Sequence, residues 1–268
     1  MMKENLWNNI KQLKKESPLV HSITNYVVMN NTANALLAAG ASPIMAHAHS
    51  EMEDMMSICQ ALVVNIGTLD EYWVTAMKKA VHQTRQLEKP WVLDPVGAGA
   101  TPYRDEVLAE LLLLNPTVIR GNASEIMALA KHNSTHTKGV DSSAESNEAV
   151  LAAKFLVEKY HCTVCISGAT DIILNHEKEI HLYNGHELMS KITGMGCTAT
   201  ALVAAFSAVI KDTMQATISA MALLGVVGEL AAKESKGPGS LQMNILDHLH
   251  TISEQDFNST LRLEKKHG

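Results

Sequence analysis

Short apolar runs alternate with longer amphipathic segments along the first two thirds of the chain. The apolar runs predict strands over residues 19–25, 42–46, 61–67, 90–97, 117–121 and 163–168. Between them, helical spacing predicts helices over residues 26–40, 71–88, 104–114 and 146–160. Several strands are apolar on both faces, as a strand sandwiched between helices requires. This alternation indicates βαβ units and a mostly parallel sheet covered by helices.

The two ends of the chain depart from this pattern. Near the N-terminus, apolar residues between positions 6 and 13 recur at helical spacing and predict an opening amphipathic helix. Residues 171–185 predict a β-hairpin with a polar turn near residues 176–178, and the chain after it is predicted to be almost wholly helical. The polar stretch 131–146 is expected to be an exposed loop over a site. Because no repeat or linker divides the chain, we expect a single domain over residues 1–268.

Composition narrows the possible partners. The chain has 268 residues, 46% of them hydrophobic, and a formal net charge of -6. This balance argues against nucleic acid or an anionic membrane as the main partner. The N-terminus does not have the pattern of a signal peptide, and the apolar stretches 202–210 and 218–227 are too short to span a bilayer. We therefore expect a cytoplasmic protein.

Cysteine and histidine clusters give weak signals for metal binding. Cys162 and Cys165 form a CxxC pair inside a predicted strand, where residues three apart point to opposite faces and cannot easily chelate one ion. His47, His49 and Glu51 alternate near a strand end, but such coincidences are expected in a chain with 13 histidines. We assign no metal to either cluster.

Acidic and small polar residues gather where three predicted strands end. In open α/β sheets, ligands bind outside the carboxyl ends of the strands. Asp94 ends one strand, and Glu125 follows the next strand on the expected first turn of a helix. Two carboxylates near a phosphate predict Mg²⁺, which takes one or two carboxylates together with waters and phosphate oxygens. A strand-end cap for Asp94 and a helix N-terminal charge for Glu125 are the structural alternatives.

The segment "ITGMGCTATAL" predicts an anion-binding turn. Gly194 and Gly196 permit a tight backbone before an apolar helix, so backbone N–H groups near Cys197 point at an anion. Neither a P-loop nor a dinucleotide-binding glycine fingerprint occurs in the chain. A nucleotide site in this protein must therefore have another design.

Five segments together resemble the hydroxyethylthiazole kinases of thiamine biosynthesis, within the ribokinase-like superfamily. They are "HSITNYVVMNNTANALLAAGASPIMAHA", "VLDPVGAGAT", "IRGNASEI", "GVDS" and "ITGMGCTATAL". The sequence departs from the family at His49 and Ser50, where a proline and an acid are expected. The resemblance implies a three-layer ribokinase-like α/β fold with helices on both faces of the sheet. It also implies Mg²⁺-dependent transfer of the γ-phosphate of ATP to the primary alcohol of 4-methyl-5-(2-hydroxyethyl)thiazole.

The resemblance also assigns residues. It places Cys197 where ribokinase-like relatives carry a catalytic aspartate, within an anion hole formed by Gly194, Met195, Gly196 and Cys197. We expect a helix N-terminus to lower the pKa of this thiol and so supply some thiolate as a base. The alternative is that Cys197 only shapes the turn.

The nucleotide and acceptor contacts implied by the resemblance come from other strand ends. The expected ATP contacts are Arg120, Asn122, Ser167 and Thr170, with Asp171 supporting the same strand end. The expected thiazole contacts are Asn25, Met45 and Gly194. Family members are trimers with the thiazole site between subunits, so the resemblance implies a homotrimer in which Asn25 and Met45 face another chain's Cys197.

Two other functions remain open at this stage. One is a kinase for another small alcohol, such as a hydroxymethylpyrimidine, or an ATP-dependent dehydratase of similar fold. The other is a non-catalytic binder of nucleotides or thiamine precursors. The "GMGC" cysteine argues against the first, and the joint presence of Asp94, Glu125 and Cys197 argues against the second.

Overall fold

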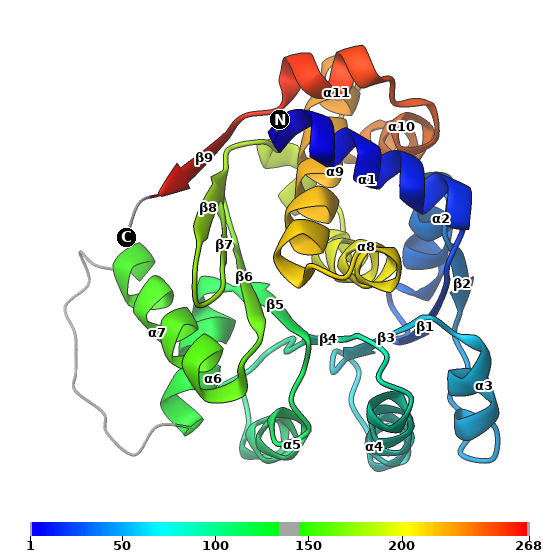
Figure 1. Cartoon of the computed structure of the whole chain (residues 1–268), viewed down its shortest axis with the longest axis vertical. Helices are drawn as coiled ribbons and strands as arrows, with labels where there is room; N and C mark the ends of the chain where they lie inside the picture. Colours follow the sequence, from blue (N-terminus) through cyan, green and yellow to red (C-terminus); the bar gives the residue numbers. More distant parts are fainter. Residues whose placement is uncertain (1, 134–144, 267–268) are drawn as a thin grey trace.

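A nine-stranded sheet forms the middle layer of the molecule, and helices cover both of its faces (Figure 1). The computed structural model describes residues 2–133 and 145–266. The strands are β1 (Leu19–Ile23), β2 (Ser42–Ile44), β3 (Ala61–Asn65), β4 (Trp91–Asp94), β5 (Val118–Asn122), β6 (Thr163–Ser167), β7 (Asp171–Leu174), β8 (Glu179–Leu182) and β9 (Leu263–Lys266). The α-helices are α1 (Met2–Glu16), α2 (Met29–Ala39), α3 (Met52–Ile58), α4 (Glu71–Gln86), α5 (Pro102–Leu112), α6 (Ala123–Asn133), α7 (Glu145–Tyr160), α8 (Met195–Val209), α9 (Thr213–Glu234), α10 (Pro238–Thr251) and α11 (Glu254–Thr260). A 3₁₀ turn, η1, spans Glu187–Lys191.

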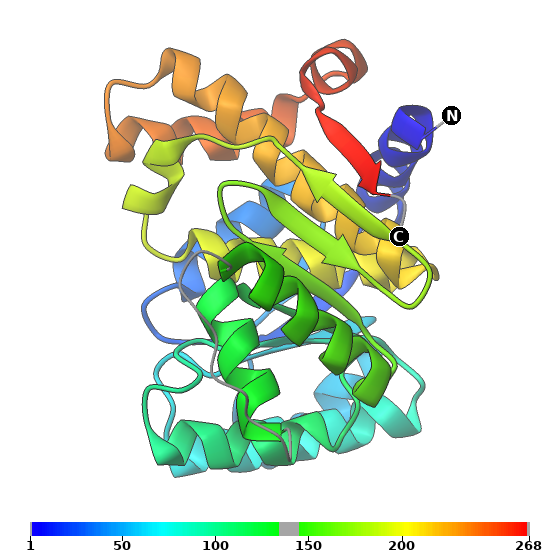
Figure 2. The ribbon, with the colours of Figure 1, turned by 90° about the vertical axis from the view of Figure 1, so that its left-hand side faces the viewer.

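The sheet is parallel in one part and antiparallel in the other. Its order is β2-β1-β3-β4-β5-β6-β7-β8-β9. The strands from β2 to β6 pair in parallel. Strand β7 pairs antiparallel with β6, and β8 and β9 continue the antiparallel part (Figure 2). The α/β fold with a mostly parallel sheet, predicted from the alternating pattern, is confirmed.

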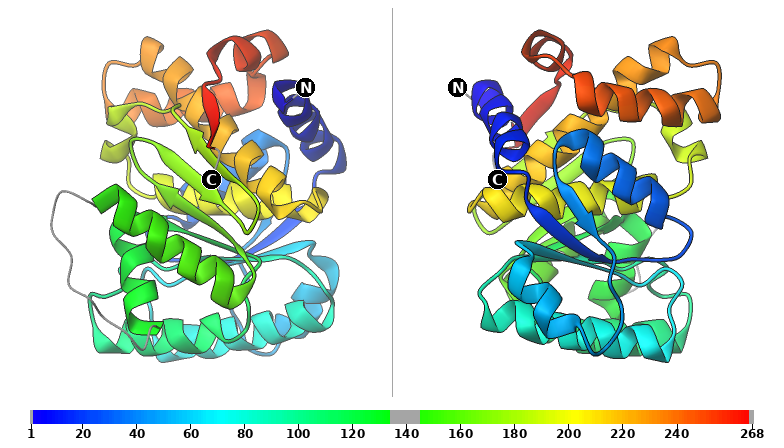
Figure 3. Two further views of the ribbon diagram at one scale, coloured as in Figure 1. Left: turned by 60° about the vertical axis from the view of Figure 1, so that its left-hand side comes forward. Right: turned by 90° about the vertical axis from the view of Figure 1, so that its right-hand side faces the viewer.

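Alternating side chains divide each central strand between two cores. Val63 of β3 and Val92 of β4 pack on the face covered by α1, α2, α8, α9, α10 and α11. Their neighbours Val64 and Leu93 pack on the face covered by α3 to α7. Two-sided burial explains why both strands are apolar at every position before their polar last residue. Figure 3 shows the two helical layers from either side of the molecule.

The same alternation separates the CxxC pair. Cys165 belongs to the first core and Cys162 to the second, so the two sulfurs lie on opposite faces of the sheet. Strand geometry predicts this separation, and it is confirmed.

The predicted hairpin of residues 171–185 is also present. It forms β7 and β8, and its turn is closed by Asn175, whose side-chain oxygen accepts hydrogen bonds from the backbone N–H groups of Glu177 and Lys178. The prediction of an almost wholly helical C-terminal third is wrong at its end, because β9 pairs with β8 as the edge strand. The segment "GVDS", and most of the polar stretch 131–146, lie outside the described residues.

Helix α9 corrects another expectation. It has 22 residues, and among the described helices it is the one long and apolar enough to cross a membrane. The expectation that the apolar stretches are too short is therefore wrong for this segment. However, 83% of its most apolar window is buried inside the protein, where α9 packs on α8 and α10. Its hydropathy is explained by its place in the core.

Candidate active site

The polar ends of the central strands meet at one edge of the sheet. In the parallel register, Asn65 at the end of β3 pairs with Asp94 at the end of β4. Asn122 at the end of β5 pairs in the same way with Ser167 at the end of β6. Helix α8 begins at this edge and packs on β3 and β4. The strand ends singled out in the sequence thus lie together with the glycine turn that precedes α8.

Helix α8 begins at a glycine because the turn requires one. Gly194 precedes the helix with φ 80°, a left-handed backbone conformation that disfavours other residues. A Cβ atom at this position would also lie 2.5 Å from a methyl carbon of Val28. The first N–H groups of any α-helix lack acceptors within the helix. For α8, these are the N–H groups of Met195, Gly196 and Cys197, the residues at which the sequence predicts an anion hole.

Arg120 lies against this helix start. Its side chain extends from β5 and is 9% exposed. A Cβ atom at Gly196 would lie 2.7 Å from a guanidinium nitrogen of Arg120, so the missing side chain allows the close approach. Within the described part of the chain, the Nε atom of Arg120 is buried without a hydrogen-bond partner. A buried guanidinium beside unpaired helix N–H groups is an arrangement that favours an anion such as phosphate.

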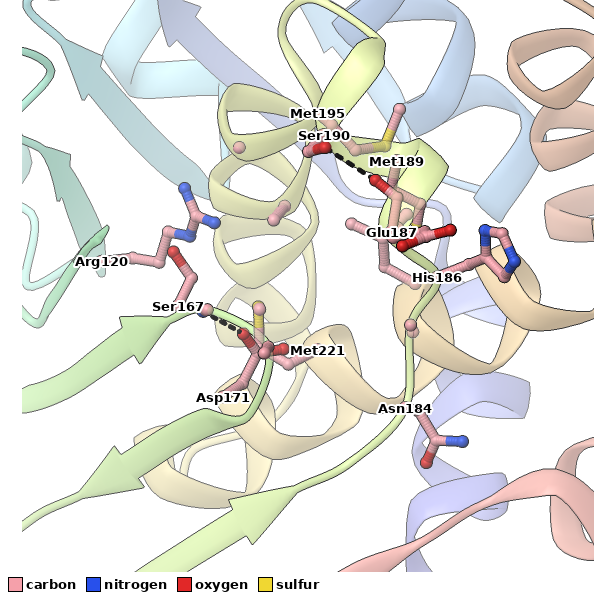
Figure 4. Close-up of a pocket in the computed structure, with 17 residues that line it drawn as sticks. Arg120, Ser167, Asp171, Asn184, His186, Glu187, Met189, Ser190, Met195 and Met221 are labelled. Atoms are coloured by element: carbon pink, nitrogen blue, oxygen red, sulfur yellow. Dashed lines mark hydrogen bonds between the residues drawn. The ribbon is translucent and has the colours of Figure 1, made fainter. Parts of the chain in front are cut away.

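A cavity of about 630 Å³ opens beside Arg120 (Figure 4). Its polar wall contains Arg120, Ser167 and Asp171, and its apolar wall is rich in methionine. The other lining residues are Gly168, Ala169, Asn184, Gly185, His186, Glu187, Met189, Ser190, Met195, Gly196, Ala199, Met221, Leu224 and Gly225. The volume and the mixed lining suit a nucleotide, whose base is apolar on its faces and whose phosphates are charged.

Two of the predicted ATP contacts do not line this cavity. The Asn122 side chain accepts hydrogen bonds from the Ser124 hydroxyl and the Glu125 backbone N–H, which is a helix-capping arrangement at the start of α6. Thr170 is half-buried in the turn between β6 and β7 and is not among the lining residues. Asn122 and Thr170 therefore remain predictions, whereas Arg120 and Ser167 do line the cavity.

Asp94 is buried below the first turns of α8. Its Oδ2 accepts hydrogen bonds from Asn65 Nδ2 at 2.7 Å and from Thr200 Oγ1 at 2.8 Å. The pKa of this carboxyl is raised from 3.8 to about 6, mainly by burial and to a smaller extent by the nearby charge of Glu125. The Arg120 guanidinium opposes both effects, which indicates that the three charges influence one another. No described residue donates a hydrogen bond to Asp94 Oδ1.

Cys197 lies on the first turn of α8, beside two amide side chains. Its sulfur accepts hydrogen bonds from Asn65 Nδ2 at 3.1 Å and Asn25 Nδ2 at 3.5 Å. The expected lowering of the thiol pKa by the helix N-terminus is wrong. Burial, followed by the charge of Asp94, raises the pKa of Cys197 to about 11, and the two amide donors only partly offset this.

Glu125 is held by the backbone. Its two oxygens accept hydrogen bonds from the Gly97 N–H at 3.1 Å and the Asn122 N–H at 2.9 Å. The carboxylate thus ties the loop after β4 to the end of β5, which is more than the helix N-terminal charge considered from the sequence. Its charge still reaches Asp94, whose pKa it raises.

Of the predicted thiazole residues, Asn25 and Gly194 lie at the start of α8, whereas Met45 has no described contact with Cys197. Asn25 contacts Cys197 of its own chain, so the expectation that it faces another chain's Cys197 is wrong. Met45 follows β2 and is half-buried, with no described contact to Cys197. Gly194 precedes α8, as the glycine motif predicts.

Two histidines after Met45 have a structural role, and one of them, His49, is a position at which the sequence departs from the family. His47 stacks on Trp73 with ring centroids 5.1 Å apart, and His49 stacks on Tyr72 at 3.8 Å. The His49 ring nitrogen Nε2 also lies 2.7 Å from the Tyr72 backbone carbonyl. These histidines therefore pack the segment after β2 against the start of α4.

Sequence analysis missed Asn65 and Thr200, which hold Asp94. Asn65 had a detectable signal, because it is the polar residue that ends the apolar strand "ALVVN", as Asp94 ends "WVLD". Thr200 is one turn inside an apolar helix and had none. The methionines of the cavity wall were also missed, since methionine is common in ordinary cores.

A single, mostly parallel sheet between two layers of helices, with a cavity at the carboxyl ends of its strands, is the fold of the ribokinase-like class of kinases. Solved structures agree with the fold: a pyridoxal kinase from Staphylococcus aureus superposes with a TM-score of 0.63 at 18% identity, covering 92% of this chain and 97% of its own. The chain belongs to the hydroxyethylthiazole kinase family, whose sequence model matches residues 10–255.

Close relatives carry the same name. A hydroxyethylthiazole kinase from Syntrophus aciditrophicus is 51% identical over 261 residues, which are 97% of each chain. One from Vibrio parahaemolyticus is 51% identical over 265 residues, covering 98% of this chain and 99% of its own. The structure of the hydroxyethylthiazole kinase protein from Pyrococcus horikoshii OT3 superposes with a TM-score of 0.91 at 40% identity, covering 98% of this chain and all of that one.

Proposed function

We propose that this protein transfers the γ-phosphate of ATP to the primary alcohol of 4-methyl-5-(2-hydroxyethyl)thiazole, in thiamine biosynthesis or salvage. The proposal takes residues 1–268 as one kinase domain, acting in the cytoplasm. Family membership supports the reaction, and the geometry of the strand edge supports the assignment of residues to roles.

The observation that carries the proposal is Arg120 at the start of α8. A buried guanidinium, next to helix N–H groups and lining a cavity large enough for a nucleotide, would bind phosphate oxygens. Ser167 would contact the nucleotide from the same wall. Phosphoryl transfer passes through a loose transition state, so positioning and charge neutralisation provide most of the catalysis.

The acceptor alcohol would bind on the other side of the α8 start. Asn25 contacts Cys197 there, and we assign Asn25, Met45 and Gly194 to the thiazole pocket. The γ-phosphate would then lie over the N–H groups from Met195 to Cys197, between the two substrates.

The carboxylates at this edge fit Mg²⁺. Asp94 has one oxygen that no described residue binds, and Glu125 adds a second negative charge close by. Asp94 would hold the ion and Glu125 would add its charge, with phosphate oxygens and waters as the remaining ligands. Bound Mg²⁺ would neutralise charge on the transferring phosphate.

Cys197 would act on the hydroxyl group that is to be phosphorylated. With a pKa of about 11 the group is a thiol at neutral pH, so its first task is to orient the hydroxyl. We predict that Cys197→Ala depresses kcat strongly, because the hydroxyl is no longer oriented, while Cys197→Asp stays active, because a carboxylate can both orient the hydroxyl and accept its proton. Steady-state rates with saturating ATP would measure this. Equal activity of the alanine variant and the parent would remove both the orienting role and any role as a base.

We also propose that the protein is a homotrimer with acceptor sites near subunit interfaces. Tyr26, Val27 and Tyr72 are 57%, 63% and 49% exposed, and Tyr26 and Val27 directly follow Asn25. Exposed apolar side chains beside a site suit a partner subunit. Sedimentation equilibrium would measure the mass, and a monomer at micromolar concentration would contradict the proposal.

The reaction itself is tested by ADP release. Purified protein is incubated with ATP, Mg²⁺ and either the thiazole alcohol, a hydroxymethylpyrimidine or no acceptor. ADP release that depends on the thiazole supports the proposal. Release with only the pyrimidine alcohol would favour the other small-alcohol kinase, and no release with any alcohol would favour the non-catalytic binding protein.

A further inference from the structure

Asn65 occupies the centre of the hydrogen-bond network at the α8 start. It is the last residue of β3, is 1% exposed and is paired in register with Asp94. A buried primary amide has two donor hydrogens and one acceptor oxygen, all of which need partners. The structure supplies a partner for each of them.

The orientation of this amide is fixed by a backbone group. Asn65 Oδ1 accepts a hydrogen bond from the Gly67 backbone N–H at 3.0 Å, and a second from Asn25 Nδ2 at 2.9 Å. A backbone N–H can only donate, so the atom facing Gly67 must be the oxygen. Nδ2 therefore faces the opposite way.

On that side the amide has two different partners. Asn65 Nδ2 donates to Asp94 Oδ2 at 2.7 Å and to Cys197 Sγ at 3.1 Å, one hydrogen for each. The sulfur is an acceptor in this contact, so the hydrogen of the thiol itself is not used. Asn65 is thus the group that joins the buried carboxylate to the thiol.

The loop after Asn65 is also held in place. The Arg104 guanidinium donates to the backbone carbonyls of Ile66 and Gly67, and to that of Val96 at 3.0 Å. These contacts tie the loop after β3 to the loop after β4. Asn65 consequently cannot shift without breaking several hydrogen bonds.

We propose that Asn65 is a positioning residue, whose amide fixes the Cys197 sulfur relative to the Asp94 carboxylate and so sets where the thiol meets the acceptor hydroxyl. This role rests on the proposed kinase reaction. Asn25 makes the longer contact to the same sulfur, at 3.5 Å, and it lacks the link to Asp94. Asn65 therefore restrains the Cys197 sulfur and the Asp94 carboxylate more than Asn25 does.

Alkylation of Cys197 by iodoacetamide tests the hydrogen bond without any substrate. Cys59, Cys162 and Cys165 are buried, so Cys197 is the accessible thiol among the four cysteines. The attacking sulfur carries negative charge, which the Asn65 N–H stabilises. Asn65→Leu is expected to slow alkylation about tenfold, as the loss of a charge-assisted hydrogen bond implies. Mass spectrometry of the peptide containing Cys197 gives the rate.

Two further variants control this experiment. Asn65→Ala removes the amide donor without adding a charge, so it should also alkylate slowly, and it decides the matter if the leucine variant does not fold. Thr84→Val removes a buried hydrogen bond inside α4 that involves neither Asp94 nor Cys197, and should alkylate at the parent's rate. Folded Asn65 variants that alkylate as fast as the parent would overturn the proposal.

The kinase assay gives a second readout. Asn65→Leu should lower kcat about tenfold while both KM values stay within about twofold, and it should cause no further loss when Cys197 is already alanine. Equal losses in both backgrounds would show that Asn65 does not act through Cys197. A parent protein without kinase activity would refute the proposed function, while the alkylation result would still decide the role of Asn65 as a donor to the sulfur.

Discussion

Replacing Arg120 tests the phosphate site most directly. Its guanidinium is buried at the start of α8, and the structure gives it no hydrogen-bonded carboxylate partner among the described residues, although the charges of Asp94 and Asp171 are close enough to influence it. A ligand phosphate would therefore be the principal hydrogen-bonding partner of this side chain. Arg120→Met keeps much of the apolar stem and removes the charge.

The size of the effect follows from the bonds that are lost. A guanidinium can donate two parallel hydrogen bonds to a phosphate, and each bond to a charged group contributes about 1.5 to 3 kcal/mol. Together the two bonds contribute about 3 to 6 kcal/mol, so we expect kcat/KM for ATP to fall by roughly 10²- to 10⁴-fold. Arg120→Lys retains the charge but not the paired donors, so its kcat/KM for ATP should lie between that of the parent and that of Arg120→Met.

A coupled assay of ADP release at varied ATP concentration gives kcat/KM for the parent and each variant. Isothermal titration with a non-hydrolysable ATP analogue gives the loss of nucleotide affinity. The KM for the alcohol serves as an internal control and should change little, since Arg120 lies on the nucleotide side. Thermal unfolding verifies that the variants are folded. A folded Arg120→Met protein with a loss below about fivefold would refute the phosphate role.

Three further predictions concern stability in the absence of ligands. Burial raises the pKa of Asp171 from 3.8 to about 6, so the unfolded chain loses this proton at lower pH than the folded protein does, and the free energy of unfolding falls as pH rises from about 4 to 6. Asp171→Asn should therefore stabilise the protein at pH 7, by up to about 3 kcal/mol in urea unfolding. An unchanged unfolding midpoint would contradict this. Gly194→Ala should lower the free energy of unfolding by at least about 1 to 3 kcal/mol, because the residue has φ 80° and an added Cβ would meet Val28. A melting temperature equal to that of the parent would show that the substitution causes no strain. Glu125→Gln should lower the free energy of unfolding by about 1 to 3 kcal/mol in metal-free buffer, because the new amide nitrogen would face a backbone N–H. A loss of stability seen only with Mg²⁺ would argue for a purely metal-binding role.

Much of the fold could be predicted because local pattern and tertiary structure agree. The two-sided apolar strands, the hairpin after β6 and the glycine start of α8 follow from residues close in sequence. Strand β9 could not be predicted, because the charged segment "LEKK" becomes a strand only by pairing with the exposed edge of β8. Its pattern alone resembles a solvated tail.

The site shows the same limit. Asp94 and Cys197 could be found from the sequence because they stand at a strand end and at a helix start, whereas Arg120, in the middle of β5, came only from the family resemblance. The direction of the Cys197 pKa could not be found in this way, because a helix N-terminus is a local feature whereas burial and the charge of Asp94 come from the fold. Contacts across the sheet, such as Asn25 with Cys197 of the same chain, are likewise absent from any single segment.

The change from parallel to antiparallel pairing at β6 has a consequence for how new specificities could arise. The cavity beside Arg120 draws on the turn after β6, the segment after β8 and the helices α8 and α9, whereas the groups around Asp94 come from β3, β4 and α8. Helix α8 is common to both, because Met195, Gly196 and Ala199 line the cavity and Thr200 bonds Asp94. Mutations in the turn after β6 or the segment after β8 could therefore change binding of the proposed phosphate donor while leaving the proposed acceptor site intact.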